Sequence, residues 1–251
     1  MARAAIPGRL SWRLAEVEAV RAETPTVRTI ALQVPGWPGH EPGQHLDVRL
    51  TAPDGYQAQR SYSIASAPDA GEKIELTVER LPDGEVSGFL VDELRPGDRI
   101  ELRGPVGGYF VWDGDAASPL LLVAGGSGIV PLMAMLRFRA AIERDVPTRL
   151  LLSSRTIDDV IYRDELARLA AARPGLEVFH TLTRSSPPGW SGFTRRIDAA
   201  MLREIAWPPA RRPLAFVCGP TALVESVAAA LVEQGHDPGC IRTERFGPTG
   251  G

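Results

Sequence analysis

Cysteine is scarce in this sequence of 251 residues, which contains only Cys218 and Cys240. Two thiols cannot supply the ligands of a structural zinc site or an iron–sulfur cluster, and these two do not form a CxxC pair. Their number is also too small for a secreted domain built around disulfides. The sequence therefore predicts no metal site, and we expect reduced thiols in the cytoplasm.

Long apolar runs and an excess of positive charge are also absent. No stretch approaches the roughly 20 apolar residues of a membrane span, and residues 1–10 lack the apolar run of a signal peptide. The formal net charge of −3 gives no reason to expect nucleic acid or a membrane as a partner. Lys73 is the only lysine, so a phosphate site would need arginines, hydroxyls and main-chain amides. We expect a cytoplasmic monomer.

The first half of the sequence has the period of half-buried β-strands. Apolar residues alternate with polar or small residues, and Gly- or Pro-containing turns separate the segments. The alternating segments lie at 30–34, 46–50 and 74–78, and a helical stretch at 86–94 precedes a strand at 99–103. This pattern predicts an antiparallel Greek-key β-barrel over residues 1–113.

The second half alternates buried strands with helices. The apolar runs lie at 120–124, 149–153, 176–181 and 214–218, and the helical patterns at 131–143, 162–172, 197–205 and 222–234. Thr221 is a candidate N-cap of the last helix and Gly235 its stop. Strand–helix alternation predicts a doubly wound parallel sheet, so residues 114–251 are expected to form an α/β domain.

A glycine-rich turn, GGSGIVP at 125–131, joins the first predicted parallel strand to its helix. Glycines let main-chain amides approach a phosphate, and a helix N-terminus carries partial positive charge. Pro131 suits the first helical turn. A tight turn without a ligand is the alternative. The turn is not the GxSxG elbow of a hydrolase, because Ile129 occupies the place of the second glycine.

The β half contains two candidate ligand clusters. In the first, at 60–63, Arg60 can clamp a pyrophosphate, Tyr62 can lie against a planar ring and Ser63 can bond a ring nitrogen. The second, GEVS at 84–87, has the form of another phosphate turn at a helix start. Read singly, the first is also a strand with polar faces and the second an ordinary helix cap.

Cys218, Gly219 and Pro220 end a buried strand before a helix. Ligands in open parallel sheets bind at the carboxyl ends of strands, and a helix N-terminus is expected to lower the pKa of a thiol. A buried structural cysteine is the alternative. A cysteine hydrolase is unsupported, because the four histidines show no partner pattern.

The order of these motifs resembles the ferredoxin–NADP reductase superfamily over essentially the whole chain. The resemblance implies FAD on the barrel and a pyridine nucleotide on the α/β domain. It assigns FAD contacts to Arg60, Tyr62, Ser63, Val78, Arg80, Gly84, Val86 and Ser87. It assigns nucleotide contacts to Gly126, Ser127, Gly128, Pro131, Cys218, Gly219 and Pro220.

The resemblance also implies residues beside the reacting rings. Ser63 is placed near flavin N5 and Cys218 beside the nicotinamide. Glu244 and Phe246 are candidates from the C-terminal segment, which otherwise would only complete the sheet.

The nucleotide preference follows from residues that end the second and third parallel strands. Arginine and hydroxyl groups suit the extra phosphate of NADPH, whereas an acid suits the ribose hydroxyls of NADH. Ser154, Arg155 and Arg184 are therefore assigned to NADPH. Asp158 and Asp159 follow closely and leave NADH open.

The resemblance implies an NAD(P)H-dependent flavoprotein oxidoreductase that passes a hydride to flavin N5 and then single electrons to an acceptor. The sequence contains no ferredoxin-type C-x4-C-x2-C run, so a separate ferredoxin or oxygenase iron–sulfur component is expected. Arg137, Arg139, Arg195 and Arg196 are candidate contacts for an acidic carrier, unless carboxylates already pair with them. The alternatives are an NAD(P)H:flavin reductase and a non-catalytic electron-relay or nucleotide-binding subunit.

Overall fold

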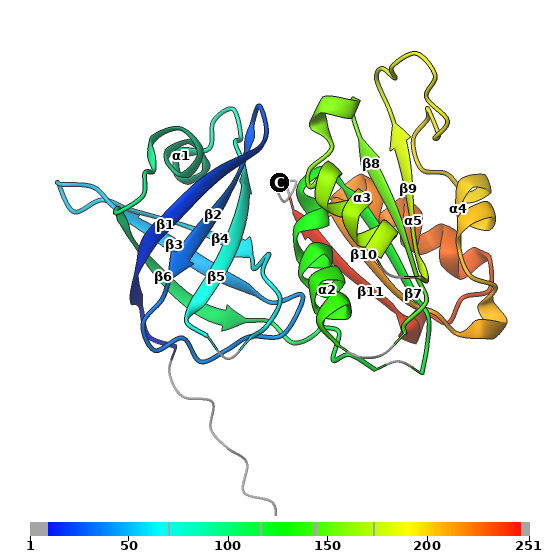
Figure 1. Cartoon of the computed structure of the whole chain (residues 1–251), viewed down its shortest axis with the longest axis horizontal. Coiled ribbons are helices and arrows are strands. Elements are labelled where there is room, and N and C mark those ends of the chain that lie inside the picture. Colours follow the sequence, from blue (N-terminus) through cyan, green and yellow to red (C-terminus); the bar gives the residue numbers. More distant parts are fainter. Residues whose placement is uncertain (1–9, 70, 116, 143–144, 173, 247–251) are drawn as a thin grey trace, which may run out of the picture.

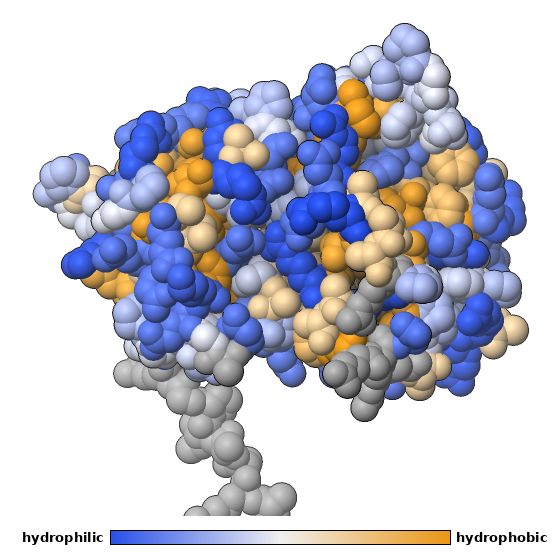
Figure 2. All heavy atoms as spheres, in the orientation of Figure 1, coloured by the Kyte–Doolittle hydropathy of each residue, from blue (hydrophilic) through white to orange (hydrophobic). Residues whose placement is uncertain are grey.

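The computed structural model describes residues 10–69, 71–115, 117–142, 145–172 and 174–246. Three of the expectations fall wholly or partly on residues outside these ranges. They are the expectation about the N-terminus, the outer ends of both proposed domains and the last residue of the helix expected at 131–143. The chain forms two lobes, a β-barrel and an α/β domain (Figure 1). Hydrophilic side chains cover much of the junction between the lobes on the face seen in Figure 2.

The first lobe is a six-stranded antiparallel sheet with the order β4-β3-β6-β1-β2-β5. Its strands are β1 (Arg13–Thr24), β2 (Val27–Gln33), β3 (His45–Thr51), β4 (Gln57–Ser63), β5 (Lys73–Glu79) and β6 (Arg99–Val106). A bridge between Ile64 and Leu76 brings the two edge strands together, which closes the Greek-key barrel. Helix α1 (Glu85–Gly88) and a π-helical turn (Phe89–Glu93) separate β5 from β6.

The barrel core follows the two-residue period of the sequence. Apolar side chains at alternate positions of β2, β3 and β5 point inward and are almost fully buried. They include Ile30, Leu32, Leu46, Val48, Ile74, Leu76 and Val78. The sequence did not predict β1 as a strand, because only Ala15, Val17 and Thr24 of its twelve residues are buried.

The second lobe is a five-stranded parallel sheet with the order β11-β10-β7-β8-β9. Its strands are β7 (Leu120–Gly125), β8 (Thr148–Ser154), β9 (Leu176–Leu182), β10 (Leu214–Pro220) and β11 (Ile241–Phe246). The helices are α2 (Ile129–Ala141), α3 (Arg163–Ala172), α4 (Ala199–Ile205) and α5 (Thr221–Glu233).

The parallel sheet is covered on both faces, as a doubly wound fold requires. Leu122 of β7 belongs to the core formed with α2 and α3, whereas its neighbours Leu121 and Val123 belong to the core formed with α4 and α5. Figure 1 shows α2 and α3 on the near face of this sheet. The predicted fold class is confirmed.

The ends of α5 differ in part from expectation. Thr221 is the first helical residue and Pro220 occupies the N-cap position without a side-chain cap, so the N-cap assignment of Thr221 was wrong. Gly235 has φ of +89° and its N–H donates to the Val232 carbonyl, which ends the helix as predicted. No helix among the described residues is long and apolar enough to cross a membrane.

Candidate functional site

A cavity of about 300 Å³ lies between the two domains at the carboxyl ends of β7, β8 and β10. This is the edge at which doubly wound sheets bind ligands. The α/β domain contributes Gly125, Gly126, Ser127, Ser153, Ser154, Arg155, Asp159, Ile161, Thr183, Pro220, Leu223 and Phe246. The barrel contributes Thr24, Thr26, Val27 and Glu79, none of which the sequence analysis had assigned. Their positions in the β1–β2 hairpin and at the end of β5 carry no motif, so only the packing of the domains identifies them.

The glycine-rich turn forms one wall of this cavity. Gly126 has φ of +55°, a conformation that side chains rarely adopt. A Cβ atom on Gly128 would lie 2.2 Å from the Cys218 carbonyl oxygen, so only glycine fits there. Gly126 and Ser127 line the cavity, whereas Gly128 and Pro131 are buried beneath it and shape the turn.

Ser154 presents a buried hydroxyl group that has no hydrogen-bond partner in the described protein. Ser154 is among the residues that line the cavity, although only 6% of it is exposed. Buried hydroxyl groups are normally hydrogen-bonded, because leaving one without a partner costs about 1–3 kcal/mol. An acceptor on a bound ligand would satisfy this hydroxyl, so the site fits a nucleotide.

Two arginines meet next to Ser154. The main-chain N–H of Arg184 donates to the Arg155 carbonyl at 2.9 Å, which brings the ends of β8 and β9 together. The Arg155 guanidinium lies 3.5 Å from an oxygen of Asp159 and 3.7 Å from an oxygen of Glu79. Arg155 therefore offers donors toward the cavity, but two carboxylates already share its charge.

Cys218 and Glu244 lie side by side on β10 and β11, with 4.0 Å between Sγ and Oε2. Burial raises the pKa of Glu244 from its ordinary value of 4.5 to about 7. Burial and the negative charge of Glu244 raise the pKa of the Cys218 thiol. The expectation that the helix N-terminus lowers this pKa was wrong, because burial outweighs it. The thiol is neutral at physiological pH, and it is not activated as a nucleophile.

Phe246 ends β11 at the cavity and is 36% exposed. Figure 1 shows β11 reaching the side of the parallel sheet that faces the barrel. The C-terminal strand therefore both completes the sheet and brings an aromatic ring to the cavity.

The cluster at 60–63 lies at the end of β4. Arg60 is exposed, donates to the Gln59 carbonyl at 2.6 Å and has no carboxylate within ion-pair distance among the described residues. Its remaining donors fit a phosphate group. Tyr62 packs partly against the barrel core, and burial raises the pKa of its hydroxyl to about 12. Ser63 is half-buried and pairs with His45 across the β3–β4 ladder.

The turn before α1 is held closed by its own side chains. A Cβ on Gly84 would lie 2.2 Å from Ser87 Oγ, so the turn requires glycine. The Ser87 hydroxyl donates to the Gly84 carbonyl and accepts from the Leu81 N–H, both at 3.2 Å. Ser87 thereby fixes the shape of the turn. Because its hydroxyl is engaged within the turn, a phosphate would have to bind to main-chain amides there.

Three other residues assigned to FAD have side chains engaged within the protein. Those of Val78 and Val86 are buried in the barrel core, which leaves only their main chains for a ligand. The Arg80 guanidinium pairs with Asp92 at 2.6 Å.

Of two arginines expected at a partner surface, Arg137 is half-buried and Arg139 is buried. The Arg137 side chain is 15% exposed and pairs with Glu75 and Glu165. Arg139 is 3% exposed and donates to the Val146 and Pro174 carbonyls. The pairing of Arg137 with two carboxylates is the alternative kept open from the sequence, whereas Arg139 is too buried to contact a carrier. Arg195 is exposed and pairs with Asp198, the alternative kept open from the sequence.

Comparisons with known proteins agree with this geometry. Residues 13–111 match an oxidoreductase FAD-binding domain and residues 122–229 an oxidoreductase NAD-binding domain. The chain is 35% identical over 241 residues to ferredoxin–NADP reductase B of Sorangium cellulosum, covering 92% of this chain and 96% of that protein. It is 34% identical over 211 residues to a glycine betaine monooxygenase reductase subunit of Chromohalobacter salexigens, covering 83% of this chain and 56% of that protein. The chain thus spans little more than half the length of that relative.

Solved structures share the fold. The flavohem-like FAD/NAD-binding domain of nitric oxide dioxygenase from Vibrio cholerae matches with a TM-score of 0.84 at 24% identity, covering 94% of this chain and 99% of that one. A ferredoxin NADP+ reductase from Neisseria gonorrhoeae matches with a TM-score of 0.80 at 22% identity, covering 93% and 98%.

The chain therefore belongs to the FAD- and NAD(P)-binding oxidoreductases of the ferredoxin–NADP reductase family. It is an NAD(P)H-dependent flavoprotein oxidoreductase, with an FAD-binding barrel and an NAD-binding α/β domain. The predicted family, enzyme class and cofactor classes are confirmed.

Proposed function

We propose that this protein transfers a hydride from NADPH to FAD and passes single electrons to a separate ferredoxin or to the iron–sulfur component of an oxygenase. The observation that carries the nucleotide half of this proposal is the interdomain cavity with the unpartnered, buried Ser154 hydroxyl beside Arg155. A cavity lined by both domains is where a donor held by one can reach an acceptor held by the other.

FAD, when bound, supplies the redox chemistry: its ring accepts a hydride and can release the electrons one at a time. The chain has to hold the two cofactors in contact, which is a positioning task. On the barrel, Arg60 would hold the FAD pyrophosphate, Tyr62 would pack against the ring and Ser63 would offer its hydroxyl to the ring edge near N5. The turn of Gly84, Val86 and Ser87 offers main-chain amides to a phosphate.

On the α/β side, the turn containing Gly126 and Ser127 binds the nucleotide phosphates. Cys218, as a neutral thiol, packs beside the nicotinamide and orients it. Burial raises the pKa of Glu244 to about 7, so its carboxyl group, next to Cys218, changes charge near neutral pH. Phe246 lines the cavity and offers an aromatic surface to the nucleotide.

NADPH is the proposed donor because Arg155 and Arg184 meet at the end of the strands that bind the adenosine ribose in such folds. NADH is the second candidate, because Glu79 and Asp159 already share the charge of Arg155 and would repel a phosphate.

The substitution Arg155→Ala separates these two donors. Loss of a charge-assisted hydrogen bond should raise the KM for NADPH by about 10- to 100-fold and leave the KM for NADH nearly unchanged. Arg203→Ala, an exposed arginine on α4, is the control and should change neither constant. Equal changes for both nucleotides would contradict the 2′-phosphate assignment.

The acceptor is proposed from the relatives. The names of two relatives, ferredoxin–NADP reductase B and a glycine betaine monooxygenase reductase subunit, refer to a ferredoxin and to a monooxygenase. A flavin reductase would instead release its flavin and reduce it in solution. Protein purified with FAD that reduces an added ferredoxin faster than free FAD supports the proposal, and the reverse supports the flavin reductase.

An anaerobic titration tests the first step. The purified protein should show the absorbance of bound flavin, and NADPH should bleach that absorbance at lower concentration than NADH does. A protein that binds FAD but is bleached by neither nucleotide would overturn the proposed reaction.

A further inference from the structure

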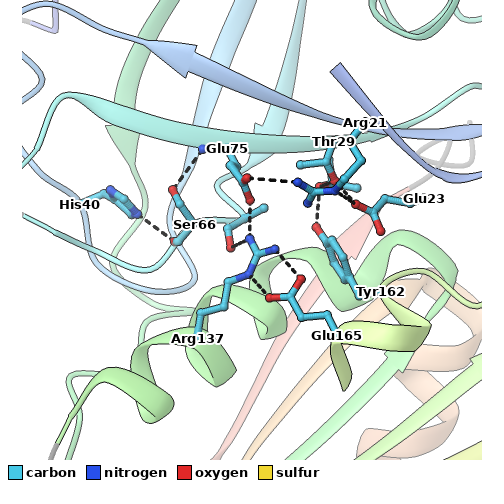
Figure 3. A network of polar contacts seen from close by, with 11 residues as sticks. Arg21, Glu23, Thr29, His40, Ser66, Glu75, Arg137, Tyr162 and Glu165 are labelled. Atoms are coloured by element: carbon cyan, nitrogen blue, oxygen red, sulfur yellow. Dashed lines mark hydrogen bonds and ion pairs between the residues drawn. The ribbon is translucent and has the colours of Figure 1, made fainter. Parts of the chain in front are cut away.

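A network of polar contacts joins the two domains beside the nucleotide cavity (Figure 3). None of its members lines that cavity. This interdomain network comprises Glu75 and Thr77 on β5 of the barrel, and Arg137, Tyr162 and Glu165 of the α/β domain. Four of them, all but Thr77, line a wider cavity of about 1050 Å³ at the junction of the domains.

Arg137 is the centre of the network. Its Nε and Nη2 atoms donate to the two carboxylate oxygens of Glu165, each at 2.8 Å, within the α/β domain. Its Nη1 atom donates across the domain boundary to Glu75 at 2.7 Å and to the Ala65 carbonyl at 2.9 Å. The planar guanidinium thus orients both partners at once, which a lysine ammonium cannot reproduce.

Tyr162 forms the second connection. Its hydroxyl donates to Thr77 Oγ1 at 2.5 Å, and Thr77 Oγ1 in turn lies 2.8 Å from Thr29 Oγ1. Tyr162 is buried and has φ of +59°, a strained conformation for a bulky residue. Such a backbone persists only where the surroundings determine it, and here the guanidinium of Arg137 lies 5.3 Å from the centre of the Tyr162 ring.

The network is built on the elements that carry the reaction site. Thr77 lies two residues before Glu79, which lines the nucleotide cavity. Helix α2, which carries Arg137, begins directly after the phosphate turn at Gly126–Gly128. Tyr162 directly follows Ile161, another residue of the cavity. A shift of the network therefore moves both walls of the site.

Apolar contacts between the domains fix their relative orientation less strictly than the hydrogen bonds of the interdomain network do. Val27, Ala65 and Phe110 pack into the core of the α/β domain, but hydrophobic contact has no directional preference. The barrel has its own core, so neither lobe needs the network for its own packing. Directional bonds distinguish one domain orientation from its neighbours, and those from Arg137 and Tyr162 connect β5 to the α/β domain. Elsewhere along the boundary, Tyr109 and Arg242 donate to the Ile241 and Val111 carbonyls.

We propose that Arg137 and Tyr162 are positioning residues that set the distance and angle between the nicotinamide on the α/β domain and the flavin on the barrel. This inference rests on the proposed hydride transfer. They touch neither cofactor and act by holding β5 against α2 and α3.

Arg137→Met removes all four hydrogen bonds and is the main test. We expect the rate of flavin reduction at saturating nucleotide to fall by about 10²-fold, the loss expected for a misplacement of about 1 Å, with FAD content and nucleotide affinity retained. Arg137→Lys should recover part of the rate. Glu177→Gln, which removes the charge from the 2.9 Å pair with Arg149 inside the α/β domain, should leave the rate unchanged.

Hydrogen exchange without nucleotide supplies a measurement that does not depend on activity. Amides at 73–79 and 157–166 should exchange faster in Arg137→Met and not in Glu177→Gln. Faster exchange with an unchanged rate would overturn the positioning role and leave a structural one. If the unsubstituted protein is not reduced by either nucleotide, the proposed function fails, and with it the positioning role that rests on it.

Tyr162→Phe is a second, milder test in case Arg137→Met does not fold. It removes only one hydroxyl and leaves Thr77 bonded to Thr29. A reduced rate of flavin reduction at saturating nucleotide with an unchanged melting temperature is the expected result. A lower melting temperature with an unchanged rate would contradict the proposal.

Discussion

Glu244→Gln tests the electrostatics of the site most directly. Glu244 lies beside Cys218 on neighbouring strands, and burial alone raises the pKa of its carboxyl group from 4.5 to about 7. The folded chain therefore keeps a proton on Glu244 at pH values where the unfolded chain has lost it. The favourable contribution is complete below pH 4.5 and is lost as the pH rises toward 7. Above that, the buried carboxylate destabilises the fold.

The magnitude follows from the two pKa values. A difference of 2.5 units, from 4.5 to about 7, corresponds to about 3 kcal/mol at pH 8 and about 0.4 kcal/mol at pH 4.5. Glutamine has nearly the same shape and no charge, so the variant escapes this cost. For a chain of 251 residues, about 3 kcal/mol corresponds to a melting temperature higher by about 6–12 °C at pH 8.

Thermal unfolding at pH 4.5 and pH 8 measures the effect. The melting temperature of Glu244→Gln should exceed that of the unsubstituted protein at pH 8 and nearly match it at pH 4.5. Glu233→Gln, at an exposed position near the end of α5, is the control and should show no such pH dependence. An equal difference at both pH values would refute the argument, because it would mean that packing and not ionisation separates the two proteins.

Two further substitutions test the binding residues. Arg60→Ala should lower the ratio of FAD to protein after dialysis, because it removes the free guanidinium proposed for the pyrophosphate, whereas Arg99→Ala, an arginine paired with Glu16 elsewhere on the barrel, should not. Ser154→Ala should leave the melting temperature unchanged or raise it, since the hydroxyl has no protein partner, and should weaken nucleotide binding by about 2- to 10-fold. Undiminished FAD content in the first case, or unchanged nucleotide affinity in the second, would contradict these assignments.

The fold could be predicted from the sequence because its signals are local. Alternation at positions such as Ile30 and Leu32 reflects the two-residue period of a strand. This period is a property of the strand backbone and does not depend on which elements pack against the sheet. The apolar run of β7 and the glycines that follow it specify a buried strand and a sharp turn within one segment. These features identified two domains and the place of the glycine-rich turn.

The sequence was less informative where a strand lacks a continuous pattern. β1 is twelve residues long, but few of them are buried, because much of this strand faces solvent on both sides. The N-cap of α5 was misplaced by one residue because Thr221 has the right chemistry, and only the backbone shows that the helix already includes it.

Charge and ionisation could not be read from the sequence at all. Arg137 and Arg139 end an apolar helix and look like solvent-facing residues, yet β5, α3 and neighbouring loops surround them. The thiol of Cys218 was expected to be acidified by a helix, but burial and Glu244 reverse the direction of the shift.

The sequence by itself thus determined most of the strands other than β1, the turns and the family to which they belong, since each depends on residues close together along the chain. Only the tertiary structure decided that Glu79 faces Arg155, that the Ser154 hydroxyl has no partner and that Arg137 joins the two domains. These depend on the distance and dielectric surroundings of groups far apart in sequence, and electrostatic energies change steeply with both.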